Sequence, residues 1–259
     1  MKNINSRLGE INYNKFNNKM TIIEYNGAND IKVKFESGDI VHSTYSHFKD
    51  GSIKSYYDKT ICNIGFLGEG IYTISPTKIN PNSKQAYRIW KGLFDRCYKH
   101  YNEQRNYVYN ECEVCEEWHN FQNFAKWYYE NYYEIDEQLM CLDKDILHKG
   151  NKIYSPENCI FVPQRINKLF TKSNRTRGSL PIGATFEKSK IRVRISIYDS
   201  VLNKKRAYFL GYFETPKEAF QAYKEAKEKY IKQVADEYKD KIPQKLYDAM
   251  YKYVVEITD

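Results

Sequence analysis

Residues 142–167, LDKDILHKGNKIYSPENCIFVPQRIN, decide how the centre of this chain folds. Apolar residues cluster at 139–146 and again at 159–162, and each run has the length of a short strand. The pair Gly150-Asn151 lies between the two runs and is typical of a loop. A helix is expected from about Gln164, so the segment predicts a hairpin of two strands with a helix packed across it.

Two polar side chains of this hairpin could meet across a small cleft. Asp143 leaves the first strand, and Asn167 sits early in the helix. A carboxylate and an amide oxygen are hard ligands, suited to Mg²⁺ or a similar ion that keeps waters for a phosphate. Asn158 is better suited to tying the loop together by hydrogen bonds to the backbone. The alternative is that these polar residues only shape a loop.

These residues resemble the ββα-metal core of HNH endonucleases of the phage homing type. In that family an Asp-His pair ends the first strand, a Gly-Asn loop follows, and a Pro-x-Asn pattern opens the second strand. An Asn or His on the helix completes the metal site. Residues 158–167, NCIFVPQRIN, match the last part without gaps, and residues 90–98 and 115–124 are similar to the helical lead-in of phage members.

The resemblance implies a hydrolase that cuts a DNA phosphodiester with one divalent metal, Mg²⁺ or Mn²⁺, bound by Asp143 and Asn167. The ion would stabilise the scissile phosphate and the leaving oxygen while a base activates water. No small-molecule cofactor is implied. The catalytic positions carried over from the family are Asp143, Lys144, Asp145, Asn158 and Asn167.

The chain departs from the family at the general base. Lys144 stands where the family has His, and a lysine is protonated near neutral pH unless burial lowers its pKa. It is therefore a poor base but a good phosphate contact. Asp145 takes the position if the register shifts by one residue. His148 or His119 could substitute, although a surface histidine is the simpler interpretation of both.

Positive charge collects in the C-terminal part of the chain. The net charge is +8, and residues 171–213 hold ten Lys and Arg against two acids, Glu187 and Asp199. A local excess of this size attracts a polyanion, and nucleic acid is the usual one. A solubilising face is the alternative interpretation.

The same part predicts a sheet that presents arginines. Arg192 and Arg194 are two residues apart and leave the same face of one strand, with Lys190 beside them. Arg206 and Tyr208 are expected to repeat this arrangement on the next strand, so that rows of arginine can contact guanine in a major groove. The expected elements are strands at 181–187, 190–198 and 206–213, and a helix from Pro216 to about Tyr238.

This segment resembles the ERF-like (APETALA-type) DNA-binding domain of plant transcription factors and phage nucleases. The similarity is carried by Gly183 and by residues 191–195, 208–215 and 218–223. It implies double-stranded DNA as the partner.

The N-terminal part predicts a small β module. Strands are expected near residues 21–25, 31–35 and 40–42, and glycines mark the turns. Residues 7–10 and 48–54 resemble the leading module of such phage proteins, which implies a DNA-contacting or spacing role.

The whole chain is therefore expected to be a multidomain α+β protein. Helices are predicted from Ser83, which could cap the first, near Trp118, and from Pro243. The predicted division is a β module at 1–79, an HNH-like core at 80–172 with its ββα-metal unit at 139–172, a polar linker at 171–178, an ERF-like domain at 178–238, and a C-terminal helix at 239–259.

The cysteines admit a structural zinc site. Cys112-Glu-Val-Cys115 has the spacing of zinc ligands, and Cys141 and Cys159 could complete a four-thiolate site. The second pair, however, sits inside apolar runs, and cysteine is among the residues most often buried. Core packing is therefore favoured over a structural zinc.

Composition excludes several classes of protein. Aromatic residues make up 16% of the 259 residues, with 25 Tyr, which is too many for wholesale disorder. No apolar run suits a membrane span or a signal peptide, so a cytoplasmic protein is expected, in the bacterial host if a phage encodes it.

Three hypotheses follow from these patterns. The first is a site-specific DNA endonuclease that nicks or cuts both strands. The second is a DNA-binding or regulatory protein whose core no longer cuts, and the third is a zinc-stabilised adaptor. The target sequence and the oligomeric state are not readable from the sequence.

Overall fold

A computed structural model describes residues 7–99, 109, 111–171, 180–199 and 204–257. Nearly all of the predicted polar linker at 171–178 lies outside these residues. The chain is an α+β protein, as predicted, and forms two compact units. The first comprises residues 1–132 with 152–157, and the second comprises 133–151 with 158–259. The predicted four-part division stays a prediction.

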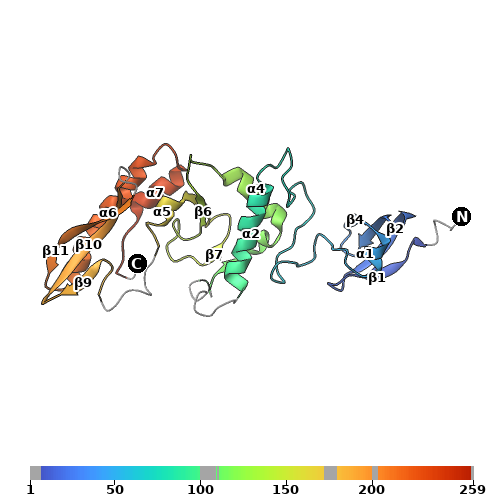
Figure 1. The fold of residues 1–259 in the computed structure, drawn as a ribbon, viewed down its shortest axis with the longest axis horizontal. Helices are drawn as coiled ribbons and strands as arrows, with labels where there is room; N and C mark the ends of the chain where they lie inside the picture. The colour runs from blue at the N-terminus through green and yellow to red at the C-terminus, as the bar shows by residue number, and fades with distance from the viewer. Residues whose placement is uncertain (1–6, 100–108, 110, 172–179, 200–203, 258–259) are drawn as a thin grey trace. The chain divides into compact units, whose positions relative to one another are not determined.

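The N-terminal part is a small antiparallel sheet, as the sequence pattern predicts, with four strands in place of the three expected (Figure 1). Its strands are β1 (Ile11–Tyr13), β2 (Lys19–Gly27), β3 (Asp30–Phe35) and β4 (Ile40–Ser43). Alternate residues of β2 and β3 are buried, and Phe48 of the short helix α1 (Tyr45–Lys49) packs among them. The sequence analysis missed β1 and α1.

A helical part completes the first unit. Helices α2 (Ser83–Tyr98) and α4 (Phe121–Asn131) pack together, and the ring of Trp90 lies 5.3 Å from that of Phe121. Ser83 does not cap α2, because Asn82 is the N-cap residue and the Ser83 hydroxyl donates to the Asn80 carbonyl. The remaining elements are the 3₁₀ turn η2 (Glu116–His119) and the parallel pair β5 (Glu113–Val114) and β7 (Ile153–Tyr154).

The second unit begins with the predicted hairpin and helix. Strand β6 (Met140–Asp143) pairs with β8 (Ile160–Pro163) in antiparallel register, with Asp143 opposite Ile160. The helix α5 (Gln164–Asn167) follows β8 directly and packs on both strands. The first strand is shorter than predicted, because the chain turns at Asp143 and the apolar residue Ile146 lies in the loop.

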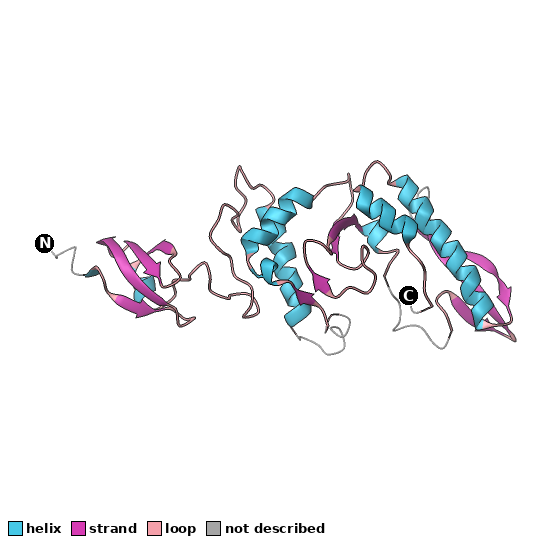
Figure 2. Cartoon of the chain, turned by 180° about the vertical axis from the view of Figure 1, so that it is seen from behind, coloured by secondary structure: helices cyan, strands magenta, loops and turns pink. Residues whose placement is uncertain are grey.

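A three-stranded antiparallel sheet and two helices complete this unit. The strands are β9 (Ala184–Glu187), β10 (Lys190–Asp199) and β11 (Lys204–Phe213), with β10 in the middle. Helix α6 (Pro216–Glu237) lies along one face of the sheet (Figures 1 and 2). A capping box of Thr215 and Glu218 starts α6, and α7 (Gln244–Lys252) packs against it.

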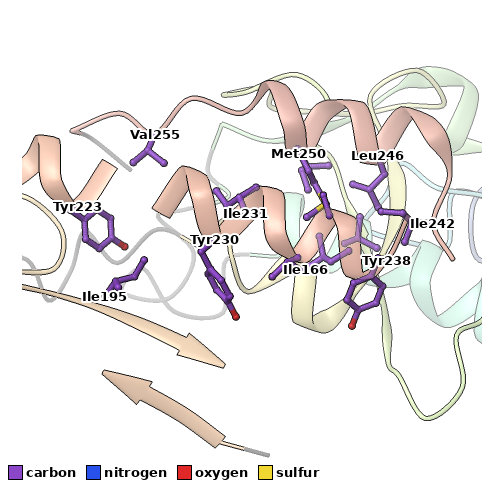
Figure 3. Packing of buried hydrophobic residues seen from close by; sticks show 14 of the residues in the cluster. Ile166, Ile195, Tyr223, Tyr230, Ile231, Tyr238, Ile242, Leu246, Met250 and Val255 are labelled. Carbon is purple, nitrogen blue, oxygen red and sulfur yellow. The ribbon is translucent and has the colours of Figure 1, made fainter. Parts of the chain in front are cut away.

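The hairpin, the sheet and the helices share one hydrophobic core. Ile160, Val162 and Ile166 of the hairpin and its helix belong to the same buried cluster as Ile191, Val193 and Ile195 of β10. Residues of α6 and α7 fill the space between them (Figure 3). The hairpin and the sheet are therefore held as parts of one body.

No helix within the described ranges is both long enough and apolar enough to span a membrane.

Candidate metal centre and nucleic-acid face

The candidate metal ligand Asp143 shapes the loop that follows β6. Its Oδ1 accepts hydrogen bonds from the backbone N–H groups of Asp145, at 2.9 Å, and Ile146, at 2.8 Å. Such a side-chain bond to the backbone two residues on stabilises a turn. Burial, and next the nearby Asp145 carboxylate, raise the pKa of Asp143 to about 6. No cation is among the causes of this shift.

Lys144 points inward and closes the loop. It is 9% exposed, and its Nζ donates to the Asn151 carbonyl at 2.9 Å and lies 3.3 Å from the Asp145 carboxylate. The Asn151 side chain donates back to the Lys144 carbonyl at 2.7 Å. These reciprocal bonds tie the two ends of the loop together. A phosphate contact needs an exposed amine, so this buried position differs from the expected role of Lys144.

The other predicted catalytic residues lie around the same hairpin. Asn158 is half-buried just before β8, and Asn167 is the half-buried last residue of α5. Because α5 packs on β6 and β8, Asn167 and Asp143 belong to the same small strand–strand–helix unit. His148 is exposed in the loop. His119 belongs to the other compact unit, where its Nε2 lies 3.1 Å from the Val114 carbonyl oxygen.

The cysteines do not form a metal site in the described part of the chain. Among those residues, no group of three or more His, Cys, Asp or Glu side chains is placed to hold a metal. Cys112 and Cys115 belong to the first unit, whereas Cys141 and Cys159 belong to the second. Burial raises the pKa of the Cys115 thiol. Cys159 is buried as the core interpretation predicts, whereas Cys141 is only half-buried.

A β-bulge changes which side chains of the sheet share a face. The register between β10 and β11 shifts between Val193 and Arg194, so that Leu210 has no partner. Arg194 then lies opposite Phe209, whereas Tyr208 lies opposite the buried Ile195. Directly opposed residues of antiparallel strands point to the same face.

The prediction that Arg206 and Tyr208 share a face of the sheet with Arg192 and Arg194 is therefore wrong. Arg206 and Tyr208 lie opposite Ile197 and Ile195, on the face that packs against α6, and not beside Arg192 and Arg194. The extra residue at the bulge reverses every side chain of β11 that precedes it. Counting alternate residues along each strand assumes regular pairing, so it could not detect that these side chains of β11 change face. The Leu210-Gly211 pair was the available signal, because Gly211 has a φ of 145° that other residues rarely adopt.

The face opposite α6 instead combines one arginine with two rings that the sequence analysis missed. Arg194 is exposed, and Phe209 and Tyr212, which are 56% and 50% exposed, make an edge-to-face contact at 5.1 Å. The other two predicted cations already have acidic partners: Arg192 lies 2.7 Å from Glu187, and Lys190 lies 3.0 Å from Glu214. We call the surface formed by Arg192, Arg194, Phe209 and Tyr212 the outer face.

Comparisons with known proteins give no further guide: no family model, no curated protein and no solved structure matches this chain.

The role of Asp143 in the loop predicts a pH-dependent stability. Its folded pKa of about 6 exceeds the ordinary 3.8, so ionisation opposes folding, and stability is lost as the pH rises from 4 through 6. Asp143→Asn keeps an oxygen acceptor but removes the charge. In chelator, we expect this variant to melt at or above the wild-type temperature at pH 7.5, with the advantage gone near pH 4.

The matched control is Asp143→Ala, which loses the acceptor as well. It should be less stable than Asp143→Asn at each pH by about 1–3 kcal/mol, because two backbone N–H groups lose their partner. Thermal melts in which Ala equals or exceeds Asn would contradict the loop-shaping role.

The position of Lys144 predicts a structural effect. Lys144→Met should lower the free energy of unfolding by about 1–3 kcal/mol, because the partly buried Asn151 carbonyl loses this donor. Lys152→Met is the control, since this lysine is exposed and has only a loose surface ion pair at 3.5 Å. Urea unfolding that leaves both variants equally stable would refute the inward placement of Lys144.

Proposed function

We propose that this chain is a metal-dependent, site-specific DNA endonuclease. Residues 139–172 would form an HNH-like hydrolytic unit, and the sheet β9–β11 would bind double-stranded DNA. The observation that carries the proposal is the shared core, because it holds Asp143 and Asn167 in one body with the outer face. A cleavage site at a fixed distance from a bound sequence requires such a rigid connection.

The donor set fits a hard divalent cation such as Mg²⁺ or Mn²⁺. Asp143 and Asn167 supply oxygen atoms, which are the ligands these ions prefer. The pKa of Asp143 is raised by burial and by Asp145, so two carboxylates lie close together in a partly buried place. A perturbed carboxyl of this kind is typical of a functional site. A bound ion would supply charge stabilisation to the scissile phosphate and the leaving oxygen.

Residues of the same loop would supply the general base. Asp145 is the best-placed base, because its side chain is 44% exposed and follows Asp143 by two residues. Lys144 lies 3.3 Å from the Asp145 carboxylate and forms an ion pair with it. His148 is the alternative base, since it is exposed on the same loop.

A second candidate function is DNA binding without cleavage. The observation that favours it is the position of Lys144. This lysine stands where the family has its general base, and its amine bonds the Asn151 carbonyl and the Asp145 carboxylate within the loop. A chain that has lost its base would keep the outer face and bind DNA as a regulator.

Cleavage assays separate the two functions. We expect the wild type to nick supercoiled plasmid carrying a random insert library with Mg²⁺ or Mn²⁺, and not with chelator. Asp143→Asn and Asn167→Ala should lose cleavage by at least about a hundredfold while DNA binding is retained, because the metal ligands act on the reaction. Metal-independent nicking would contradict the metal-dependent mechanism, and binding with no cleavage under either metal would favour the second function.

The register of β11 predicts which arginine contacts DNA. On a duplex selected from a random pool, Arg194→Gln should weaken binding roughly tenfold or more, the value of one good contact to a base. Arg206→Gln is the matched control and should bind nearly as the wild type, because Arg206 lies on the opposite face. Equal losses in fluorescence anisotropy would contradict the assignment of the outer face.

A further inference from the structure

A cleft of about 880 Å³ lies within the second unit and shares Arg194 with the outer face, whereas Arg192, Phe209 and Tyr212 do not line it. Its walls come from the chain before β6, from α5 and the residues that follow, from the edge of β10, and from α6. The volume lies in the range of ligand-binding pockets. It is too small to admit a duplex, whose recognition buries a broad and open protein surface.

Unpaired cations surround this cleft. Lys168, Arg194, Lys204 and Lys205 line it and are exposed, and no carboxylate of the described residues pairs with any of them. Lys168 has a neutral partner, the Gln164 side chain, at 3.1 Å. Two acids, Asp136 and Glu137, line the same cleft, so the cations outnumber them. This charge favours an anionic ligand with several phosphates.

The edge of β10 adds backbone groups to the lining. β9 pairs with β10 only as far as Val193, after which the Arg194 N–H donates to the Gly183 carbonyl. Tyr198 N–H donates to the hydroxyl of Tyr230. Ser196 lies between them on the same edge, where no described strand stands opposite its N–H and carbonyl. An open strand edge of this kind offers hydrogen bonds to an extended ligand.

Tyrosines line the wall formed by α6. Tyr223, Tyr230 and Tyr238 line it, but each is at most 6% exposed and packs in the core (Figure 3), which leaves the half-buried Tyr198 as the ring that a base can reach. The half-buried ring of Tyr198 joins them, with the Arg165 guanidinium 5.4 Å from its centre. Cations interleaved with aromatic rings are the combination that binds single-stranded nucleic acid, because bases stack on rings while cations follow the backbone.

We propose that this cleft binds a short single-stranded stretch of DNA. The inference rests on the proposed DNA function, and it deepens it by assigning a path to one strand of the substrate. Lys168, which lines the cleft, directly follows the candidate metal ligand Asn167 in the chain, although Asn167 itself does not line the cleft. A strand lying there would be unpaired beside the cutting site, while the duplex stays on the outer face.

Binding of a labelled oligothymidylate, followed by fluorescence anisotropy, tests the proposal in the full chain. We expect Lys168→Gln/Lys204→Gln to weaken this binding roughly tenfold and to reduce the slope of log K against log salt by about 1.4, the value for two lost phosphate contacts. The control is Lys229→Gln/Lys232→Gln, which removes two exposed charges of α6 that do not line the cleft. It should bind as the wild type.

A duplex arm keeps this proposal separate from the proposed function. Phe209→Ala, a change on the outer face and outside the cleft lining, should weaken duplex binding and leave oligothymidylate binding unchanged. Unchanged oligothymidylate affinity in Lys168→Gln/Lys204→Gln, or an equal loss for duplex and single strand, would overturn the cleft assignment. Cleft-dependent binding without metal-dependent cleavage would support the cleft and reject only the endonuclease.

Discussion

A helix of four residues is not stable in water, because forming the first helical turn fixes several residues for one hydrogen bond. α5 nevertheless ends at Asn167, the candidate metal ligand, and its position must come from packing. Ile166 is completely buried in the core with residues of α6 and α7, and such burial contributes about 1.5–3 kcal/mol. Arg165 adds an ion pair to Glu237 at 2.5 Å. Packing against the C-terminal helices α6 and α7 therefore fixes the position of Asn167, although the residues next to Asn167 in sequence are those of the hairpin.

In the loop after β6, the backbone conformation depends on keeping two carboxylates close together. Asp143 must remain close to Asp145 to hold the turn, and two partly buried carboxylates repel each other. Lys144 reduces this repulsion at Asp145 and also closes the loop through Asn151. One side chain thus offsets part of the electrostatic cost of the arrangement.

Strong local patterns predicted most of the fold. Alternation gave the sheet strands β2, β3 and β10, and Pro216 in the first turn marked the start of α6. The strand–loop–strand–helix order around residues 139–167 is also present. The site was less predictable, because its details depend on tertiary contacts. The inward turn of Lys144 comes from a backbone carbonyl seven residues away, which composition does not reveal.

The bulge at Leu210 has an evolutionary consequence. Along β11 the residues from 204 to 209 are exposed on both faces of the sheet, so neither set of side chains is committed to the core. Loss of one residue at the bulge would bring Arg206 and Tyr208 outward and turn Phe209 away, without altering the buried side of β10. A single-codon deletion could in this way exchange the entire set of groups offered to a partner. At this strand one mutation can change which side chains the outer surface of the sheet exposes.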